Sequence, residues 1–187
     1  FFVNHVRRLV VRRFSSPSQR NQGACELFYR AASNALPPEI TEHSALDLLT
    51  DQETKKALLL DMDETLIHST ARLTPGRRSD FEVEVYMQDI SCVFHVLKRP
   101  YVDEFLQEMF KYYRVYIFTS STATYANPII DRLDRAGRLS GRFFRPFCTQ
   151  IGGVLVKDIL SMGFPRAGSI LVDNSALAYS LCRSNAI

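Results

Sequence analysis

Two carboxylates, Asp61 and Asp63, follow directly on the apolar run from Ala57 to Leu60 and are only two residues apart. A short apolar run that ends in polar residues is typical of a buried strand, and ligand sites in parallel sheets lie where the strands end. Two like charges so close together in a protein interior repel each other unless a cation or a proton offsets them. We therefore expect a divalent cation beside Asp61 and Asp63.

Polar side chains also stand at three later positions where an apolar run ends. Thr119 offers a hydroxyl that can bind a phosphate oxygen, and Lys157, after the Gly152-Gly153 turn, offers a charge that can neutralise phosphate. Asp173 and Asn174 offer the oxygen ligands that a hard cation such as magnesium prefers. Each residue also has an ordinary interpretation, as a strand-end threonine, a surface lysine or a helix cap. Their joint occurrence in this order favours an active site.

Apolar periodicity predicts the elements that hold these residues. We expect five strands, at Ala57 to Leu60, Phe81 to Val85, Cys92 to Leu97, Val115 to Phe118 and Ile170 to Val172. We expect amphipathic helices after Pro100 (Val102 to Phe110) and after Thr122 (Tyr125 to Leu133), and a further helix at Ala176 to Cys182. Strands that alternate with helices predict a parallel sheet in an α/β fold.

Composition limits the class of protein. The 187 residues, 46% hydrophobic, suffice for one domain with a core and a short tail. Four cysteines without a C-x-x-C pair favour a reducing compartment and neither a zinc ribbon nor a disulfide framework. No apolar run approaches the length of a membrane-spanning helix.

Pro37 and Pro38 predict a linker over 25–54 with a short helix at Ser44 to Leu49, and the catalytic domain is expected over 55–187.

The first 24 residues contain no acidic side chain and carry five arginines among apolar and serine residues. This composition resembles a mitochondrial presequence, and Arg12-Arg13-Phe14-Ser15-Ser16 resembles a processing site. We expect mitochondrial location through a transit peptide. The alternatives are a basic tail, in a protein of the nucleus or cytosol, or an arm that binds nucleic acid, which we do not expect because no aromatic-rich face accompanies it.

The blocks Asp61-Met62-Asp63-Glu64-Thr65-Leu66-Ile67-His68-Ser69 and Leu97-Lys98-Arg99-Pro100-Tyr101-Val102-Asp103 resemble the small CTD-phosphatase-like proteins, also called NLI-interacting-factor-like phosphatases, of the haloacid dehalogenase superfamily. Later blocks, including Phe118-Thr119-Ser120-Ser121, Val156-Lys157-Asp158 and Val172-Asp173-Asn174-Ser175, extend the likeness over Lys55 to Ile187. The resemblance implies a doubly wound, Rossmann-like parallel sheet with a small antiparallel sheet inserted between the first two core strands, at about 70–98. Asn185-Ala186 match the start of a family segment, so we expect the domain to be truncated at its C-terminus.

The resemblance also implies a mechanism. Asp61 would be the nucleophile that forms an aspartyl-phosphate, and Asp63 the general acid and base. Thr119 and Lys157 would position the phosphoryl oxygens. Magnesium would be the cofactor, held by the following groups: the Asp61 carboxylate, the Asp63 carbonyl and Asn174, with Asp173 behind them.

The substrate implied by the resemblance is a phosphoprotein or phosphopeptide bearing phosphoserine or phosphothreonine. The candidate substrate-binding residues are Thr65, Val85, Met87, Phe94 and Arg145. Ala71 and Thr122 are smaller or more polar than the family's residues at a proline-binding pocket, and Pro146-Phe147 replace its usual Glu-Ser.

A non-catalytic receptor or scaffold is the alternative function. The mitochondrial presequence translocase contains a subunit of this fold whose catalytic carboxylates have decayed, and mitochondrial membrane-complex subunits would then be partners. A scaffold has no chemical need for the retained set of Asp61, Asp63, Lys157, Asp173 and Asn174, and this favours catalysis.

Overall fold

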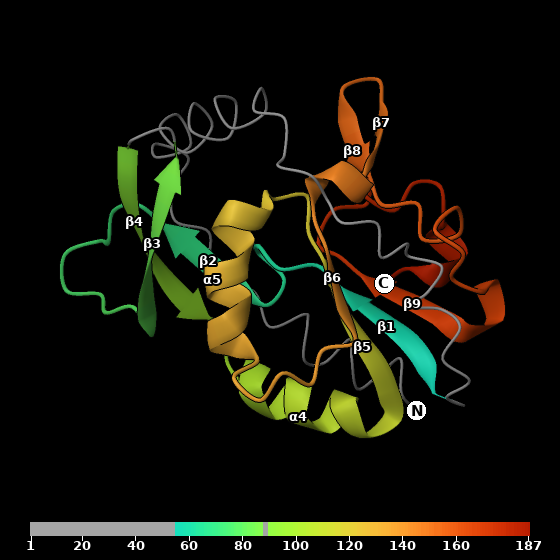
Figure 1. Ribbon diagram of the computed structural model, residues 1–187, viewed down its shortest axis with the longest axis horizontal. Helices are drawn as coiled ribbons and strands as arrows, with labels where there is room; N and C mark the ends of the chain where they lie inside the picture. The colour runs from blue at the N-terminus through green and yellow to red at the C-terminus, as the bar shows by residue number, and fades with distance from the viewer. Residues whose placement is uncertain (1–54, 88–89) are drawn as a thin grey trace.

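Strand β1 (Lys56–Leu60) lies inside a parallel sheet, as its unbroken apolar sequence predicts. The computed structural model describes residues 55–87 and 90–187. Its main sheet has the order β6-β5-β1-β9, with β5 (Tyr113–Phe118) and β9 (Ser169–Val172) parallel to β1 on either side and β6 (Gly141–Phe143) at one edge. All four strands therefore end at the same edge of the sheet (Figure 1).

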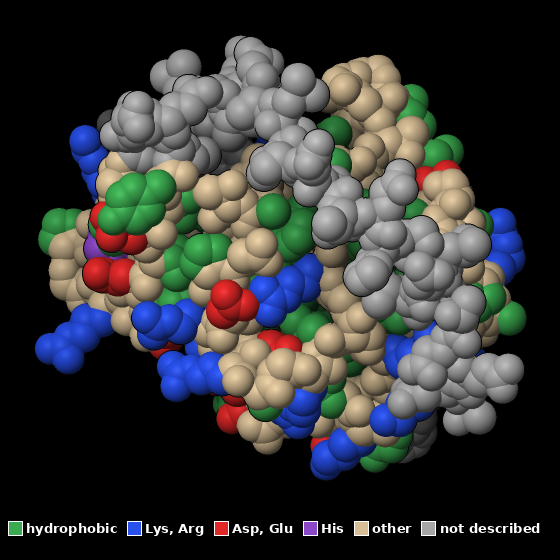
Figure 2. Space-filling view, in the orientation of Figure 1, with side chains coloured by type: hydrophobic (Ala, Val, Ile, Leu, Met, Phe, Trp, Pro, Cys, Tyr) green, Lys and Arg blue, Asp and Glu red, His purple; other side chains and the backbone are tan. Residues whose placement is uncertain are grey.

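Two amphipathic helices, α4 (Val102–Tyr112) and α5 (Ala123–Leu133), cover one face of the main sheet. Their buried residues share one core cluster with Leu58, Leu60 and Val115. Both helices lie at the positions that the apolar periodicity predicts. Figure 2 shows Lys and Arg side chains over the side of the molecule that carries α4 and α5, so the polar faces of these helices meet solvent.

The opposite face of the sheet is covered by the C-terminal segment, which contributes Ile159, Phe164 and Cys182 to a second core cluster. The predicted helix at Ala176 to Cys182 is wrong: this stretch forms turns, followed by the 3-10 helix η5 (Arg183–Asn185). Its amides bond to carbonyls three residues back, as Cys182 N does to Tyr179 O. The carbonyl of Ala178, which an α-helix would pair with the Cys182 amide, accepts from Lys157 N instead.

A three-stranded antiparallel sheet is inserted between β1 and β5, and this confirms the expected fold class. Its order is β2-β4-β3, with β2 (Ile67–Thr70), β3 (Phe81–Met87) and β4 (Ile90–Lys98). The sheet lies to one side of the main sheet, against α5 (Figure 1). Its strands alternate, and the buried residues Val83, Val85, Phe94 and Val96 belong to the core beneath α4 and α5.

A small hairpin precedes Lys157. It consists of β7 (Thr149–Ile151) and β8 (Val154–Val156), joined at Gly152 and Gly153 with φ of 55° and 82°. Short 3-10 helices stand before it, η3 (Arg145–Phe147), and after it, η4 (Arg166–Gly168). The two strands and β6 were not predicted, since three residues carry too little periodicity.

Several predictions concern residues that lie outside the described part of the chain. They are the basic segment 1–24, the linker 25–54 and its short helix at Ser44 to Leu49. The division of the chain into these segments and a domain over 55–187 stays a prediction. No helix of the described residues is long and apolar enough to cross a membrane.

Candidate active site

The polar residues singled out from the sequence meet at the edge where the parallel strands end. Asp61 follows β1 and Asp173 follows β9, and the Asp61 amide donates to Val172 O at 2.9 Å. Thr119 follows β5, and its amide donates to Phe143 O of β6 at 2.9 Å. The backbone pairing of the sheet thus continues one residue past the strands and fixes where these side chains begin.

Lys157 lies between the two carboxylates. Its Nζ donates to Asp61 Oδ1 and to Asp173 Oδ2, both at 2.5 Å. All three residues are buried, with exposed fractions of 1% for Lys157 and 6% for each aspartate. The structure therefore assembles three predicted site residues from β1, β8 and β9 into one buried ion cluster.

Burial and charge shift the ionisation of this cluster in opposing ways. Burial raises the pKa of Asp61 to about 7, although the Lys157 ammonium acts against it. Burial also disfavours the charge of Lys157, but Asp61 and Asp173 outweigh that effect and raise the pKa of the lysine. Lys157 therefore stays an ammonium group, and Asp61 ionises more readily with additional positive charge nearby.

Asp63 accepts two hydrogen bonds that sequence reasoning missed. Tyr125 Oη donates to Asp63 Oδ1 at 2.7 Å, and Ser121 Oγ donates to Asp63 Oδ2 at 2.8 Å. Burial raises the pKa of Asp63, and these two donors oppose the rise. The periodicity of α5 marked Tyr125 only as a core residue, and Ser121 was only a neighbour of Thr119 in the sequence. Tertiary structure alone brings both to Asp63.

Arg99 holds the loop that follows Asp63. Its Nε donates to Thr65 O at 2.5 Å and one terminal nitrogen donates to Glu64 O at 2.8 Å, while Glu64 has a left-handed φ of 59°. A non-glycine residue in this conformation is strained and persists only where its surroundings hold it. Arg99 thus fixes the loop that carries Asp63. The sequence offered one sign of such a role, because Arg99 lies in the Lys98-Arg99-Pro100 block that resembles the family.

Three further polar residues predicted for the site lie at the same edge of the sheet: Asn174, Thr65 and Thr119. Thr65 Oγ1 donates to Asn174 Oδ1 across 3.4 Å, which is a long contact. Thr119 is buried, and its Oγ1 accepts from the Ser121 amide at 3.1 Å. The Asn174 carbonyl oxygen therefore retains capacity for a further ligand, and the Thr119 hydroxyl can still donate its own hydrogen.

The donor set fits a hard divalent cation. Asp61 and Asp173 bring two carboxylates against the single ammonium of Lys157, with Asp63 beside them, so negative charge exceeds positive charge once Asp61 is ionised. Lys157 occupies Asp61 Oδ1, and Asp61 Oδ2 has no hydrogen-bond partner among the described residues. No three His, Cys, Asp or Glu side chains of residues 55–87 and 90–187 form a ready metal cluster. The magnesium site expected from the sequence is of a different kind, because two of its ligands are the backbone carbonyl of Asp63 and the side-chain amide oxygen of Asn174.

The candidate substrate-binding residues lie in different surroundings. Arg145 is half-buried, and its Nε donates to Ser120 O at 2.8 Å, one residue from Thr119. Val85 and Phe94 are buried in the core, so they present little surface to a ligand here. Met87 ends β3, and its side chain is outside the described part of the structure. The role of these residues in substrate binding stays a prediction.

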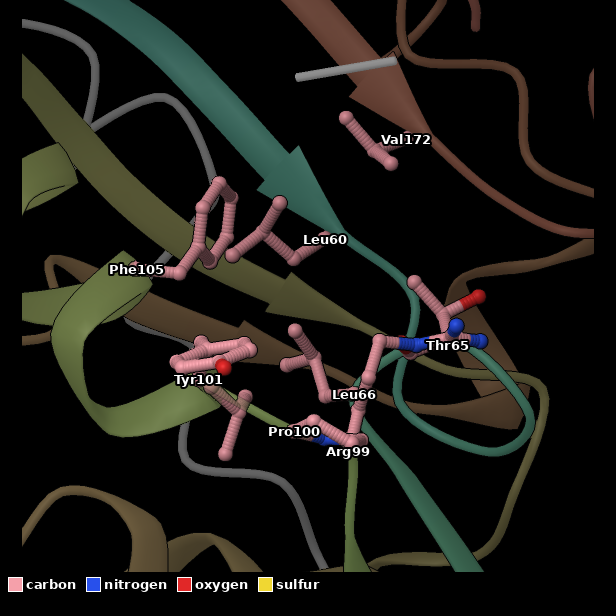
Figure 3. Close-up of a pocket in the computed structure, with 9 residues that line it drawn as sticks. Leu60, Thr65, Leu66, Arg99, Pro100, Tyr101, Phe105 and Val172 are labelled. Carbon is pink, nitrogen blue, oxygen red and sulfur yellow. The ribbon is translucent and has the colours of Figure 1, made fainter. Parts of the chain in front are cut away.

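A small pocket lies beside the catalytic loop, where β1 and β9 approach the start of α4 (Figure 3). It measures about 20 Å³ and is lined mainly by apolar side chains with Thr65 and Arg99 at one end. That volume holds about one water molecule. The pocket is a packing gap beside the site and not a phosphopeptide-binding groove.

A parallel α/β sheet with an inserted antiparallel sheet, and with an aspartate cluster at the carboxyl ends of its strands, defines a protein of the haloacid dehalogenase type. The chain belongs to the NLI interacting factor-like phosphatase family, whose model matches residues 56–187. The family resemblance expected from the sequence is thereby confirmed, and the relatives are protein phosphatases.

Two curated relatives illustrate the similarity. The mouse "carboxy-terminal domain RNA polymerase II polypeptide A small phosphatase 2" is 36% identical over 86% of this chain and 56% of its own length. The human "CTD small phosphatase-like protein" is 41% identical over 71% of this chain and 48% of its own length. The chain thus spans about half the length of these relatives.

Solved structures show the same fold. The fission yeast RNA polymerase II CTD phosphatase Fcp1, bound to beryllium fluoride, matches 71% of this chain and 40% of its own with a TM-score of 0.58 at 20% identity. At that identity the likeness concerns the fold alone. Nothing in these comparisons supports the alternative of a mitochondrial receptor subunit.

Proposed function

We propose that this chain is a magnesium-dependent phosphatase of phosphoserine and phosphothreonine proteins, with Asp61 as its covalent nucleophile. The observation that carries the proposal is the buried cluster of Asp61, Lys157 and Asp173 beside Asp63 at the ends of the parallel strands. A structural role alone does not account for it, because replacing a buried ion cluster by apolar side chains is often neutral or stabilising.

In the first half-reaction, an Asp61 carboxylate oxygen forms a bond to phosphorus while the bond from phosphorus to the serine or threonine oxygen breaks. Asp63 gives its proton to the departing oxygen. The Lys157 ammonium, already 2.5 Å from Asp61 Oδ1, reduces the repulsion between the carboxylate and the phosphoryl oxygens. Thr119 supplies a hydroxyl donor from the end of β5.

In the second half-reaction, water attacks the aspartyl-phosphate. Asp63, now a carboxylate, takes a proton from the water, and inorganic phosphate leaves as Asp61 is restored. One residue can serve both steps because the leaving oxygen and the attacking water occupy the same side of phosphorus in turn. Burial raises the pKa of Asp63 and thus favours the protonated form that the first step needs.

Magnesium would be held by the Asp61 carboxylate, the Asp63 carbonyl and Asn174, with Asp173 behind them. When bound, it offsets the excess negative charge of the site and of the phosphate. The uncommitted Oδ2 of Asp61 and the weakly engaged Asn174 Oδ1 support this assignment.

The relatives' names tie several of them to the carboxy-terminal domain of RNA polymerase II. For this chain we propose the wider class of phosphoproteins, with Arg145 and Thr65 near the phosphorylated residue. Ala71 and Thr122, which are small or polar where the family has larger apolar residues, do not favour the polymerase tail itself.

The proposal is tested by magnesium-dependent hydrolysis of p-nitrophenyl phosphate. Asp61→Asn should lower kcat by more than about 1,000-fold, because a neutral amide neither attacks phosphorus nor binds the cation well. Asp131→Asn, at an exposed carboxylate on α5, is the matched control and should change kcat less than about twofold. Hydrolysis by Asp61→Asn at the wild-type rate would exclude Asp61 as the nucleophile.

The covalent step is tested separately with Asp63→Asn. This variant keeps the nucleophile but cannot activate water, so a phosphate ester with a good leaving group should load Asp61 and the aspartyl-phosphate should persist. Mass spectrometry of the acid-quenched protein should place the added phosphate on Asp61. No trapped phosphate in a variant that still hydrolyses the ester would contradict a covalent intermediate.

A further inference from the structure

Tyr125 on α5 lies between the inserted antiparallel sheet and Asp63. Its hydroxyl donates to Asp63 Oδ1 at 2.7 Å and is also hydrogen-bonded to Ser69 Oγ of β2. The tyrosine is 5% exposed, so few water molecules can replace either partner. The three side chains form a continuous link from β2 through α5 to the catalytic loop.

We propose that Tyr125 is a positioning residue for Asp63, and that Ser69 orients the Tyr125 hydroxyl for this purpose. The inserted sheet then contributes directly to proton transfer, because it fixes the carboxyl group that protonates the leaving oxygen. This inference rests on the proposed function of Asp63 as general acid and base.

The geometry of Asp63 supports a positioning role. Tyr125 donates to Oδ1 and Ser121 donates to Oδ2, so each carboxylate oxygen has its own donor. Two such bonds fix both the position and the plane of the carboxyl group. With Ser121 alone, the carboxyl group can rotate about the remaining hydrogen bond and leave the line to the leaving oxygen.

Packing by itself requires the Tyr125 ring but not its hydroxyl. The ring lies edge-on to Phe94 of β4, with centroids 5.1 Å apart and planes at 74°, and belongs to the main core cluster. A phenylalanine has the same ring and would keep these contacts. The hydroxyl is hydrogen-bonded to Ser69 and Asp63, so its removal breaks the polar link and leaves the ring in place.

The link also ties the acid to the inserted sheet. Ser69 belongs to β2, whose register with β4 places it opposite Val96, and Phe94 of β4 packs on the Tyr125 ring. The inserted sheet thus holds Tyr125 at both its hydroxyl and its ring. A shift of this sheet against α5 would therefore move the hydroxyl that positions Asp63.

The decisive experiment compares aryl phosphates whose leaving groups differ in pKa. A good leaving group needs little help from an acid, whereas a poor one depends on the position of Asp63. Because kcat/KM reports only the steps up to departure of the leaving group, it isolates the acid step from the later attack of water. For Tyr125→Phe we expect kcat/KM for phenyl phosphate to fall about 10- to 100-fold and kcat/KM for 2,4-dinitrophenyl phosphate to fall less than about threefold. Tyr112→Phe, which removes an exposed hydroxyl on α4, is the control and should match the wild type.

A double-mutant cycle tests the part assigned to Ser69. Ser69→Ala should show the same dependence on the leaving group with a smaller loss. It should cause no further loss in the Tyr125→Phe background, because Ser69 acts only through the tyrosine hydroxyl. Losses that multiply in the double variant would overturn the link through Ser69.

Other results would overturn the positioning role. An equal loss of kcat/KM with every leaving group would mean that Tyr125 only supports the fold or, where the loss lies in KM at constant kcat, that it contacts the substrate. If the wild type hydrolyses none of these esters, the proposed function fails, and the inference is then decided by crystal structures of the wild type and Tyr125→Phe. An Asp63 carboxyl group that turns away from its wild-type position in the variant supports positioning, and an unmoved one refutes it.

Discussion

The Lys157 side chain is 1% exposed although it carries a charge. Removing an ammonium group from water costs several kcal/mol, and its contacts with Asp61 and Asp173 offset that cost. The two carboxylates depend on the lysine in the same way, since their repulsion is uncompensated without it. Lys157 therefore holds both aspartates, and loss of its ammonium group leaves two buried like charges.

Lys157→Met should reduce the free energy of unfolding by about 3–5 kcal/mol, because methionine fills a similar volume but leaves both carboxylates without a counter-charge. Saturating magnesium should recover part of this loss, because a bound cation supplies charge beside Asp61. Urea unfolding with and without magnesium measures both effects. Lys111→Met, at the exposed end of α4, is the control and should change stability by less than about 1 kcal/mol. A Lys157→Met protein as stable as the wild type would show that the ion cluster does not hold the site together.

At the scale of elements, the β7–β8 hairpin carries Lys157 to the sheet edge. Gly152 and Gly153 form its turn with positive φ, and Lys157 follows the last residue of β8. The Lys157 amide donates to Ala178 O, and Cys182 Sγ lies 3.4 Å from Lys157 O. The backbone of the lysine is thus held on both sides by the C-terminal turns. In these turns the Cys182 amide bonds to Tyr179 O and not to Ala178 O, so the Ala178 carbonyl can accept from the Lys157 amide.

Gly153→Ala should lower the free energy of unfolding by about 1 kcal/mol, because an L side chain at φ of 82° is strained. A Cβ at this position would meet no atom within 4 Å, so the loss is conformational and not steric. Gly153→Asn is the matched comparison and should lose less, since asparagine tolerates left-handed φ better than alanine. Thermal unfolding of the two variants distinguishes these cases. Equal losses for alanine and asparagine would contradict a cause in the backbone conformation.

At the scale of the whole molecule, the active site draws on both sheets. The main sheet supplies Asp61, Thr119 and Asp173 from its strand ends, whereas the inserted sheet reaches Asp63 through Ser69 and Tyr125. Two helices cover one face of the main sheet and the C-terminal turns cover the other. The basic segment 1–24 lies outside this described part of the chain.

Residues 1–24, fused to a fluorescent reporter, should carry it into mitochondria in a manner that depends on membrane potential. The reason is that the potential acts on positive charge, and this segment has five arginines and no acidic residue. Substituting Arg7, Arg8, Arg12 and Arg13 by glutamine should abolish import, as fluorescence microscopy with and without an uncoupler would show. A reporter that remains in the cytosol or nucleus would refute the mitochondrial prediction without touching the phosphatase proposal.

Much of the fold could be predicted because local sequence determines it. The short apolar run before Asp61 is typical of a buried strand, and the spacing of Val102 to Phe110 and of Tyr125 to Leu133 predicts helices with one buried face. The alternation of Phe81 to Val85 likewise predicts a half-buried strand. Strand ends in a parallel sheet meet at one edge, so the approach of Asp61, Thr119 and Asp173 also follows from the sequence.

Tertiary structure alone decided the rest. Asp63 is 62 residues from Tyr125 and 58 from Ser121, and no local pattern reports a contact between groups so far apart. The turns at 176–182 replace the helix that periodicity predicted, and the Ala178 carbonyl accepts from the distant Lys157 amide instead of the Cys182 amide. The sequence by itself therefore determined the longer strands, the helices α4 and α5, and which polar residues stand at the ends of β1, β5 and β9, since periodicity is a local property of the chain. Only the folded structure decided which donors reach Asp63 and how Lys157 lies between two aspartates, since hydrogen bonds depend on distances that packing sets.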